Sequence, residues 1–163
     1  MYPDNGIHWM HEGKIVFKGK CRIPNNSFIV TGKQGNIEFG DDFLASPVKL
    51  ISFIGIKFGV HTRLGWDTIV MDTNFHPLYD MEKEEFKKAY GKIEIGDANW
   101  FGTQCIIMHS VKTPERCIFG MRSVVTRGGH YESYCVHGGS PIRILSRNVM
   151  RIYGQDKISE YFE

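Results

Sequence analysis

The sequence predicts an all-β solenoid, in which one chain winds into stacked coils of short parallel strands. Two blocks of sequence, one before and one after residue 76, carry a large apolar residue at every sixth position. A glycine often follows that residue, and neither block has the spacing of an amphipathic helix. A repeat of fixed period indicates a repeat architecture. The apolar residues of the period are Phe58, Leu64, Val70, Ile95, Phe101, Ile107, Phe119 and Val125.

A unit of six residues has room for one short strand and one corner, but not for a helix pair or a hairpin. Three units would close a triangular coil of about eighteen residues, and coils stack about 4.8 Å apart through backbone hydrogen bonds. We expect the apolar residue, and the small residue two places before the next one, to point into a shared core. A right-handed crossover is the default for parallel strands, and the spacing does not determine the hand. The small residues are Thr62, Thr68, Asn99, Cys105, Val111, Cys117 and Ser123.

The chain is predicted to be one domain, residues 1–163, with three parts. Residues 1–13 are expected to form an irregular cap, residues 14–145 the solenoid, and residues 146–163 a tail with a short helix at 157–162. Residues 77–94 interrupt the repeat with a charged, mildly helical segment, which predicts a loop extruded from a corner. Loops of this kind often carry function.

Composition narrows the class of protein. The apolar fraction of 42% and the net charge of +2 suit a globular chain, and no basic stripe favours nucleic-acid binding. No apolar run is long enough to span a membrane, and the first residues lack the pattern of a signal peptide. Cys105 and Cys117 occupy small inward positions of the repeat, which predicts reduced thiols in a cytoplasmic protein.

Four stretches carry a resemblance to a known family: residues 71–77 (MDTNFHP), 95–102 (IGDANWFG), 123–127 (SVVTR) and 139–143 (GSPIR). On these motifs the chain, over residues 14–150, resembles the hexapeptide-repeat acyltransferases, which are left-handed parallel β-helix enzymes. The nearest branch is similar to sugar and capsular-polysaccharide O-acetyltransferases, relatives of galactoside and maltose acetyltransferases. The resemblance implies a left-handed coil, a homotrimer, and transfer of an acetyl group from acetyl-CoA to a sugar or polysaccharide hydroxyl. It implies no metal.

Acetyl transfer to a hydroxyl needs a base for the proton, a donor for the oxyanion and a groove for the pantetheine arm. His76 matches the family's general base, and it stands where the repeat breaks, before a proline that stiffens the backbone. A surface-loop histidine is the alternative. Asp72 and Asn74 are expected to orient the imidazole or bind the acceptor, although both residue types also suit tight turns.

The resemblance also assigns residues along the solenoid. Trp100 would stack on the sugar or the pantetheine arm, with packing at a subunit interface as the alternative. Thr103 and Met121 would line the pantetheine groove through backbone groups. Thr126, Arg127 and Arg143 would meet the nucleotide end of coenzyme A, since arginine suits phosphate.

Two other functions remain open. A zinc carbonic anhydrase of the same architecture would need three histidines, and beside His76 and His109 the third expected position is Pro114. A non-catalytic oligomeric solenoid or binding module is equally compatible with the fold. The sequence does not name the acceptor, distinguish acetyl from longer acyl donors, or say whether an N-terminal segment of its relatives is missing from it. It departs from the family pattern at Ser46, where sugar-acetylating relatives often carry an acceptor-binding Asn.

Overall fold

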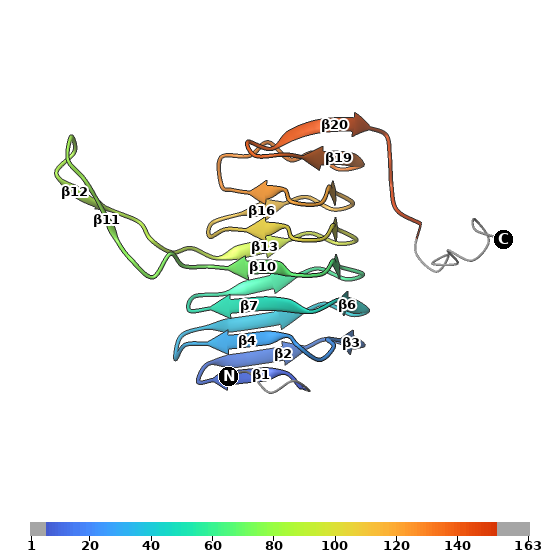
Figure 1. Ribbon diagram of the computed structural model, residues 1–163, viewed down its shortest axis with the longest axis horizontal. Helices are drawn as coiled ribbons and strands as arrows, with labels where there is room; N and C mark the ends of the chain where they lie inside the picture. Colours follow the sequence, from blue (N-terminus) through green and yellow to red (C-terminus); the bar gives the residue numbers. More distant parts are fainter. Residues whose placement is uncertain (1–5, 153–163) are drawn as a thin grey trace.

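Three parallel β-sheets form the faces of a solenoid (Figure 1). The computed structural model describes residues 6–152, and every regular element within that range is a β-strand. Successive strands pass from sheet to sheet, so each of the first five coils contributes one strand to each face, and the last coil passes from β18 directly to β19. The structure therefore confirms the predicted all-β solenoid of stacked parallel coils.

The three sheets are named A, B and C here. Sheet A contains β1 (His8–His11), β4 (Phe28–Thr31), β7 (Val48–Ser52), β10 (Thr68–Met71), β15 (Ile106–Ile107) and β18 (Val124–Val125). Sheet B contains β2 (Lys14–Phe17), β5 (Asn36–Phe39), β8 (Ile56–Phe58), β13 (Ile93–Ile95) and β16 (Lys112–Thr113). Sheet C contains β3 (Cys21–Arg22), β6 (Phe43–Ala45), β9 (Arg63–Leu64), β14 (Trp100–Phe101), β17 (Ile118–Phe119), β19 (Cys135–Gly138) and β20 (Arg143–Arg147). Only the β19–β20 pair within these sheets is antiparallel.

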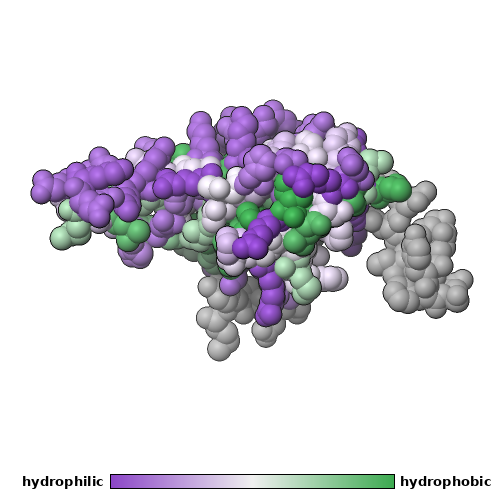
Figure 2. All heavy atoms as spheres, turned by 90° about the horizontal axis from the view of Figure 1, so that it is seen from above, coloured by the Kyte–Doolittle hydropathy of each residue, from purple (hydrophilic) through white to green (hydrophobic). Residues whose placement is uncertain are grey.

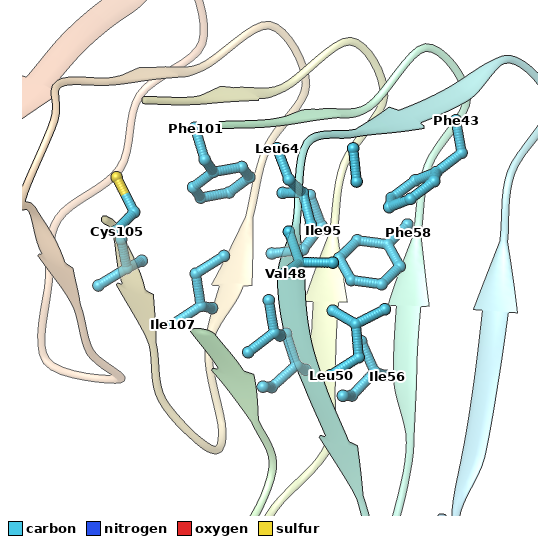
Figure 3. Close-up of a cluster of buried hydrophobic side chains, with 14 of the residues drawn as sticks. Phe43, Val48, Leu50, Ile56, Phe58, Leu64, Ile95, Phe101, Cys105 and Ile107 are labelled. Carbon is cyan, nitrogen blue, oxygen red and sulfur yellow. The ribbon is translucent and has the colours of Figure 1, made fainter. Parts of the chain in front are cut away.

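The six-residue period fills the interior as predicted. Phe58, Leu64, Ile95, Phe101 and Ile107 point into one core, together with residues from neighbouring coils (Figure 3). The small residues of the period are also buried, including the polar Thr62, Thr68, Asn99 and Ser123. Buried polar groups need hydrogen-bond partners, and these side chains find them in corner carbonyls: Thr62 Oγ1 donates to Gly59 O and Ser123 Oγ donates to Gly120 O.

The outward faces of the sheets differ in chemistry. On sheet B, neighbouring strands present Val16, Glu38, Lys57, Glu94 and Lys112 in one row, and the charges alternate. On sheet A, the outward rows are mostly apolar and half-buried. One row of sheet A holds Ile69, Ile106 and Val124, with the exposed Lys49 as the next partner of Ile69, and the adjacent row holds Val30, Ile51 and Met71. Sheet B therefore has a surface suited to water, and sheet A one suited to packing.

The extruded loop is a β-hairpin, not a helical turn. Strands β11 (Leu78–Asp80) and β12 (Glu85–Lys87) pair antiparallel and project from the solenoid (Figure 1). We call residues 73–90 the arm. Seen from above, the arm is mostly hydrophilic with a few hydrophobic residues (Figure 2). Within the described range, no helix has the length and hydropathy to cross a bilayer.

Both ends differ from the expectation. Residues 8–11 are not irregular but form β1, which pairs with β4 and so begins the solenoid one strand earlier. The glycine-rich connection at 128–141 contains β19, which continues sheet C, and the last strand β20 runs antiparallel to it. The helix expected at 157–162 lies outside the described residues.

Candidate active site

His76 lies at the root of the arm, at the corner where sheets A and B meet. Strand β10 precedes the arm in sheet A, and β13 follows it in sheet B. Thr73 and Tyr90 form an antiparallel bridge, and the Gly91 N–H donates to Asp72 O at 2.9 Å. These bonds close the arm onto the solenoid and leave His76 exposed between β10 and β11. A side chain exposed at a fixed corner can reach a bound substrate.

Asp72 lies beneath this root and is completely buried. Its carboxylate accepts hydrogen bonds from Ser52 Oγ at 2.8 Å and from the N–H groups of Phe53, Ile54 and Gly55 at 2.8, 2.9 and 2.6 Å. These four hydrogen bonds offset the free-energy cost of burying the carboxylate. All four bonds go to the turn in the coil below, so Asp72 fixes that turn. A contact with the acceptor sugar stays a prediction.

The same corner carries His109 and Arg127 in successive coils. Their positions follow from the register, in which Val70, Ile107 and Val125 are stacked partners two residues before Asp72, His109 and Arg127. Burial, and then the charges of Arg127 and Lys88, lower the pKa of His109. His109 is therefore biased toward the neutral imidazole at the base of the arm.

A pocket of about 180 Å³ opens on sheet C and the following corner. Trp66 and Trp100 border it and are 60% and 38% exposed, so their rings are available to a ligand. The Arg151 guanidinium lies 5.1 Å from the centroid of the Trp100 ring. The remaining lining residues are Leu44, Ser46, Arg63, Leu64, Gly65, Gly102 and Thr103. Flat rings beside polar groups suit a sugar or the pantetheine arm of coenzyme A.

The floor of this pocket is fixed by an ionic cluster. Arg63 is buried, and its guanidinium donates to the backbone carbonyl of Asp42 and, at 2.6 Å, to its carboxylate. His61 Nδ1 lies 2.8 Å from the same carboxylate. Hydrogen bonds from Arg63 and His61 lower the pKa of Asp42. The Asp42 carboxylate therefore remains ionised across neutral pH and holds the Arg63 side chain against the sheet.

The predicted cofactor residues fall into separate groups. Thr103 and Met121 occupy stacked turns at the corner between sheets C and A, where the Arg122 N–H donates to Thr103 O. Thr126 and Arg127 follow β18, at the corner that carries the arm. The Thr126 N–H donates to Tyr131 Oη at 2.9 Å. Arg143 is exposed at the start of β20 in sheet C.

One chain therefore brings some of the predicted residues together and separates others. Trp100 and Thr103 share the pocket, whereas His76 lies between β10 and β11 at the root of the arm. The arm projects from the side of the solenoid opposite to β3 and β6 (Figure 1). Asn74 lies beside His76, with a buried amide oxygen that accepts no hydrogen bond in the structure. Within residues 6–152, no three His, Cys, Asp or Glu side chains are grouped to hold a metal ion.

Sequence reasoning assigned no site role to Trp66, Arg63 or Arg151, which border the pocket. Trp66 and Arg63 occupy outward positions of the repeat. A large aromatic or a cation at such a position can be read from the sequence as a candidate ligand contact. Arg151 follows the last strand and has no repeat phase, so only the folded chain brings it to Trp100.

Three curated relatives match at the level of sequence, and no family model does. Two of the three are Klebsiella proteins. An uncharacterized 24.8 kDa protein in the cps region of Klebsiella pneumoniae is 27% identical over 147 residues, which are 90% of this chain and 64% of that protein. A chloramphenicol acetyltransferase of Klebsiella aerogenes is 30% identical over 71 residues, which are 44% of this chain and 32% of the enzyme. The chain thus spans less than two thirds of the length of either relative.

Solved structures match over more of the chain. The polysialic acid O-acetyltransferase OatWY has a TM-score of 0.61 at 19% identity, covering 96% of this chain and 92% of its own. A galactoside acetyltransferase in complex with coenzyme A has a TM-score of 0.65 at 19% identity, covering 88% and 70%. At such identities a likeness establishes the fold and not the activity. The chain has the β-solenoid fold of the hexapeptide-repeat acetyltransferases.

Proposed function

We propose that the protein is an acetyl-CoA-dependent O-acetyltransferase that acetylates a hydroxyl of a sugar or polysaccharide, with His76 as general base. The observation that carries the proposal is the exposed His76 at the one corner where the chain leaves the solenoid. The aromatic pocket on sheet C supports a sugar or pantetheine ligand, and the solenoid likeness to acetyltransferases supports the reaction class.

In the proposed reaction, His76 takes the proton of the acceptor hydroxyl as its oxygen attacks the thioester carbonyl of acetyl-CoA. The tetrahedral intermediate then collapses, the carbon–sulfur bond breaks, and the coenzyme A thiolate takes a proton as it leaves. Trp100 and Asn74 would hold the acceptor. Thr103 and Met121 would line the pantetheine groove, with Thr126, Arg127 and Arg143 toward the nucleotide.

We propose further that the site is completed by a second copy in a homotrimer. His76 lies at the corner between sheets A and B, whereas the pocket opens on sheet C and the following corner, so a substrate that needs both must lie between copies. Sheet A presents Ile69, Ile106 and Val124 outward, and sheet C with its following corner presents the exposed Trp100 and Trp66. A closed ring of heterologous contacts between these two apolar faces would leave the charged sheet B in water.

Comparison of His76→Ala with wild type tests the general base. Both are assayed for release of free coenzyme A from acetyl-CoA with a panel of sugar and polysaccharide acceptors. Loss of a general base is expected to lower kcat by about 10²- to 10⁴-fold. Affinity for coenzyme A should stay within about twofold, because the base acts on the hydroxyl proton and not on the cofactor. Full activity in the variant would refute the role of His76.

Co-expression tests the shared site. His76→Ala and Trp100→Ala chains should each be inactive alone. In randomly mixed trimers, about a quarter of the interfaces combine an intact His76 with an intact pocket. We therefore expect up to about a quarter of wild-type activity to return in the mixture. If each site lay within one chain, the mixture would stay as inactive as its two components.

A further inference from the structure

The backbone turns sharply immediately before His76. The His76 N–H donates to Asn74 O at 2.7 Å, and Phe75 between them has a φ of 61°. A hydrogen bond between residues two apart defines a γ-turn, and the form with positive φ is rare and strained. A bulky residue at positive φ is itself uncommon. The surrounding structure must hold Phe75 in this conformation.

The repeat does not account for this conformation. Other non-glycine residues with positive φ, such as Asp67, Gln104 and Arg122, occupy equivalent corners of successive coils. There the stacking of one coil on the next imposes the turn. Phe75 lies in the root of the arm, so it does not belong to the series of equivalent corners in which those residues stack on one another.

Local contacts hold Phe75 instead. Its N–H donates to Thr73 Oγ1 at 3.0 Å. Its ring meets the ring of Phe53 edge to face, with centroids 5.2 Å apart and planes at 82°. On the other strand of the arm, Ala89 O accepts the Asn74 N–H at 2.7 Å. An edge-to-face pair of aromatic rings is stabilised by its geometry as well as by its buried area.

Phe53 is fixed in turn from two directions. Its N–H donates to the buried Asp72 carboxylate, which also binds the rest of that turn. Its ring lies directly against the Gly32 backbone, since a Cβ on Gly32 would be 2.4 Å from the ring. Asp72 and Gly32 therefore fix Phe53 to the solenoid, and Phe53 contacts Phe75, the residue directly before His76.

We infer that Phe53 and Phe75 form an aromatic clamp that positions His76 for proton transfer. The inference rests on the proposed function, because that function makes His76 the base. Phe75 and Phe53 are positioning residues that act through the γ-turn and touch no reacting atom. Thr73 Oγ1 is the polar part of the clamp.

Kinetics of Phe53→Ala, Phe75→Ala and the double variant test the clamp. Misplacement of a base by about 1 Å can reduce turnover on the order of 100-fold, so we expect kcat to fall 10- to 100-fold in each variant. KM for acetyl-CoA should stay within about twofold. The double variant should be no worse than Phe75→Ala alone, because both changes remove one shared contact. Thr73→Val should lower kcat, and Thr73→Ser should restore it.

Phe17→Ala is the matched control. Phe17 is 51% exposed, as Phe75 is, and it stacks on Phe39 with centroids 5.3 Å apart on sheet B. Its loss should lower Tm about as much as the clamp variants do, with kcat within twofold of wild type. Wild-type kcat in Phe53→Ala, additive losses in the double variant, or an equal kcat loss in Phe17→Ala would each overturn the clamp.

A readout independent of activity separates this inference from the proposed function. The ring Hε1–Cε1 NMR signal of His76 should be one sharp line in wild type and broadened or split in Phe53→Ala and Gly32→Ala. If His76→Ala keeps full acetyl transfer, the proposed base is wrong. The NMR signal of the His76 ring is then the test of whether Phe53 and Phe75 position the imidazole. If His76→Ala is inactive while the signal and kcat of Phe53→Ala are unchanged, the base stands and the clamp is wrong.

Discussion

His137 is fully buried in β19, and both of its ring nitrogens face hydrogen-bonding groups. Nδ1 lies 3.4 Å from Ile118 O, and Nε2 accepts the Glu132 N–H at 3.2 Å. Only the neutral imidazole with its proton on Nδ1 satisfies both contacts. The ring also stacks on Phe119, with centroids 5.1 Å apart. Protonation would therefore break the Glu132 contact inside the core.

This geometry predicts a loss of stability in mild acid. Burial lowers the pKa of His137 below its usual value near 6.5, so the unfolded chain binds the proton more readily than the folded chain. The free energy of unfolding should be level above about pH 6.5 and fall below it, by up to about 1.4 kcal/mol per pH unit.

Urea unfolding at pH 7.5 and 5.5 measures the effect. His137→Gln should be less stable at pH 7.5 but lose less on acidification. The pKa of His109 is also lowered, so His109 also lowers the free energy of unfolding in acid, and this contribution remains in the variant. An unchanged difference between the two pH values in His137→Gln would show that His137 titrates alike in the folded and the unfolded chain.

At the scale of elements, the arm shows why a charge pattern is a weak guide to secondary structure. Residues 81–90 carry acidic and basic residues at helical intervals, which favoured a helical turn. In the hairpin, Asp80 instead accepts the N–H groups of Glu82 and Lys83 and pairs with Lys87 at 3.2 Å. Tyr79 and Phe86 face each other across the two strands. Cross-strand pairs and a capped turn thus decided the element.

Corner glycines set the spacing of the coils and allow a stability test. A Cβ on Gly102 would lie 2.8 Å from the Met121 backbone nitrogen in the next coil, and backbone cannot move aside as a flexible side chain can. Gly102→Ala should therefore destabilise the protein by about 1–3 kcal/mol, as overpacking does. Differential scanning calorimetry should show a fall in Tm.

Gly128→Ala is the control for this change. Nothing lies within 4 Å of a Cβ at Gly128, so the same chemical substitution meets open space. Its Tm should match wild type or rise slightly, because alanine restricts the unfolded chain more than glycine does. An equal fall of Tm in both variants would mean that coil spacing is not the cause.

At the scale of the whole molecule, the contrast between sheets A and B makes the proposed assembly testable. Ile106→Lys introduces a charge between Ile69 and Val124 on the apolar face of sheet A. If that face packs against another copy, burial of an unpaired charge should dissociate the assembly. Light scattering should then report a lower mass for the variant than for wild type at micromolar concentration.

Val16→Lys is the matched change on sheet B. Val16 is the stacked partner of Glu38, so a lysine there continues the alternation of charge on that face. The variant should keep the mass of the wild-type assembly. A wild-type mass for Ile106→Lys, or a monomeric wild type, would remove the homotrimer and with it the site shared between copies.

The sequence by itself determined the solenoid, because a period of six leaves one way for its apolar and small residues to be buried together. It also located the interruption that carries His76, since a break in a strict repeat is visible without coordinates. Local alternation in short segments was less informative, so the strand at 8–11 and the hairpin of the arm were missed.

Only the tertiary structure decided how the candidate site is built. Folding brought Arg151, which follows the last strand, to Trp100, and the stacking of adjacent coils placed Asp72 above the turn that holds Phe53. It also separated His76 from the pocket on sheet C. Those relations depend on which of the three faces of the solenoid each residue lies on, and on which coil stacks against it. A linear sequence pattern does not specify contacts between coils.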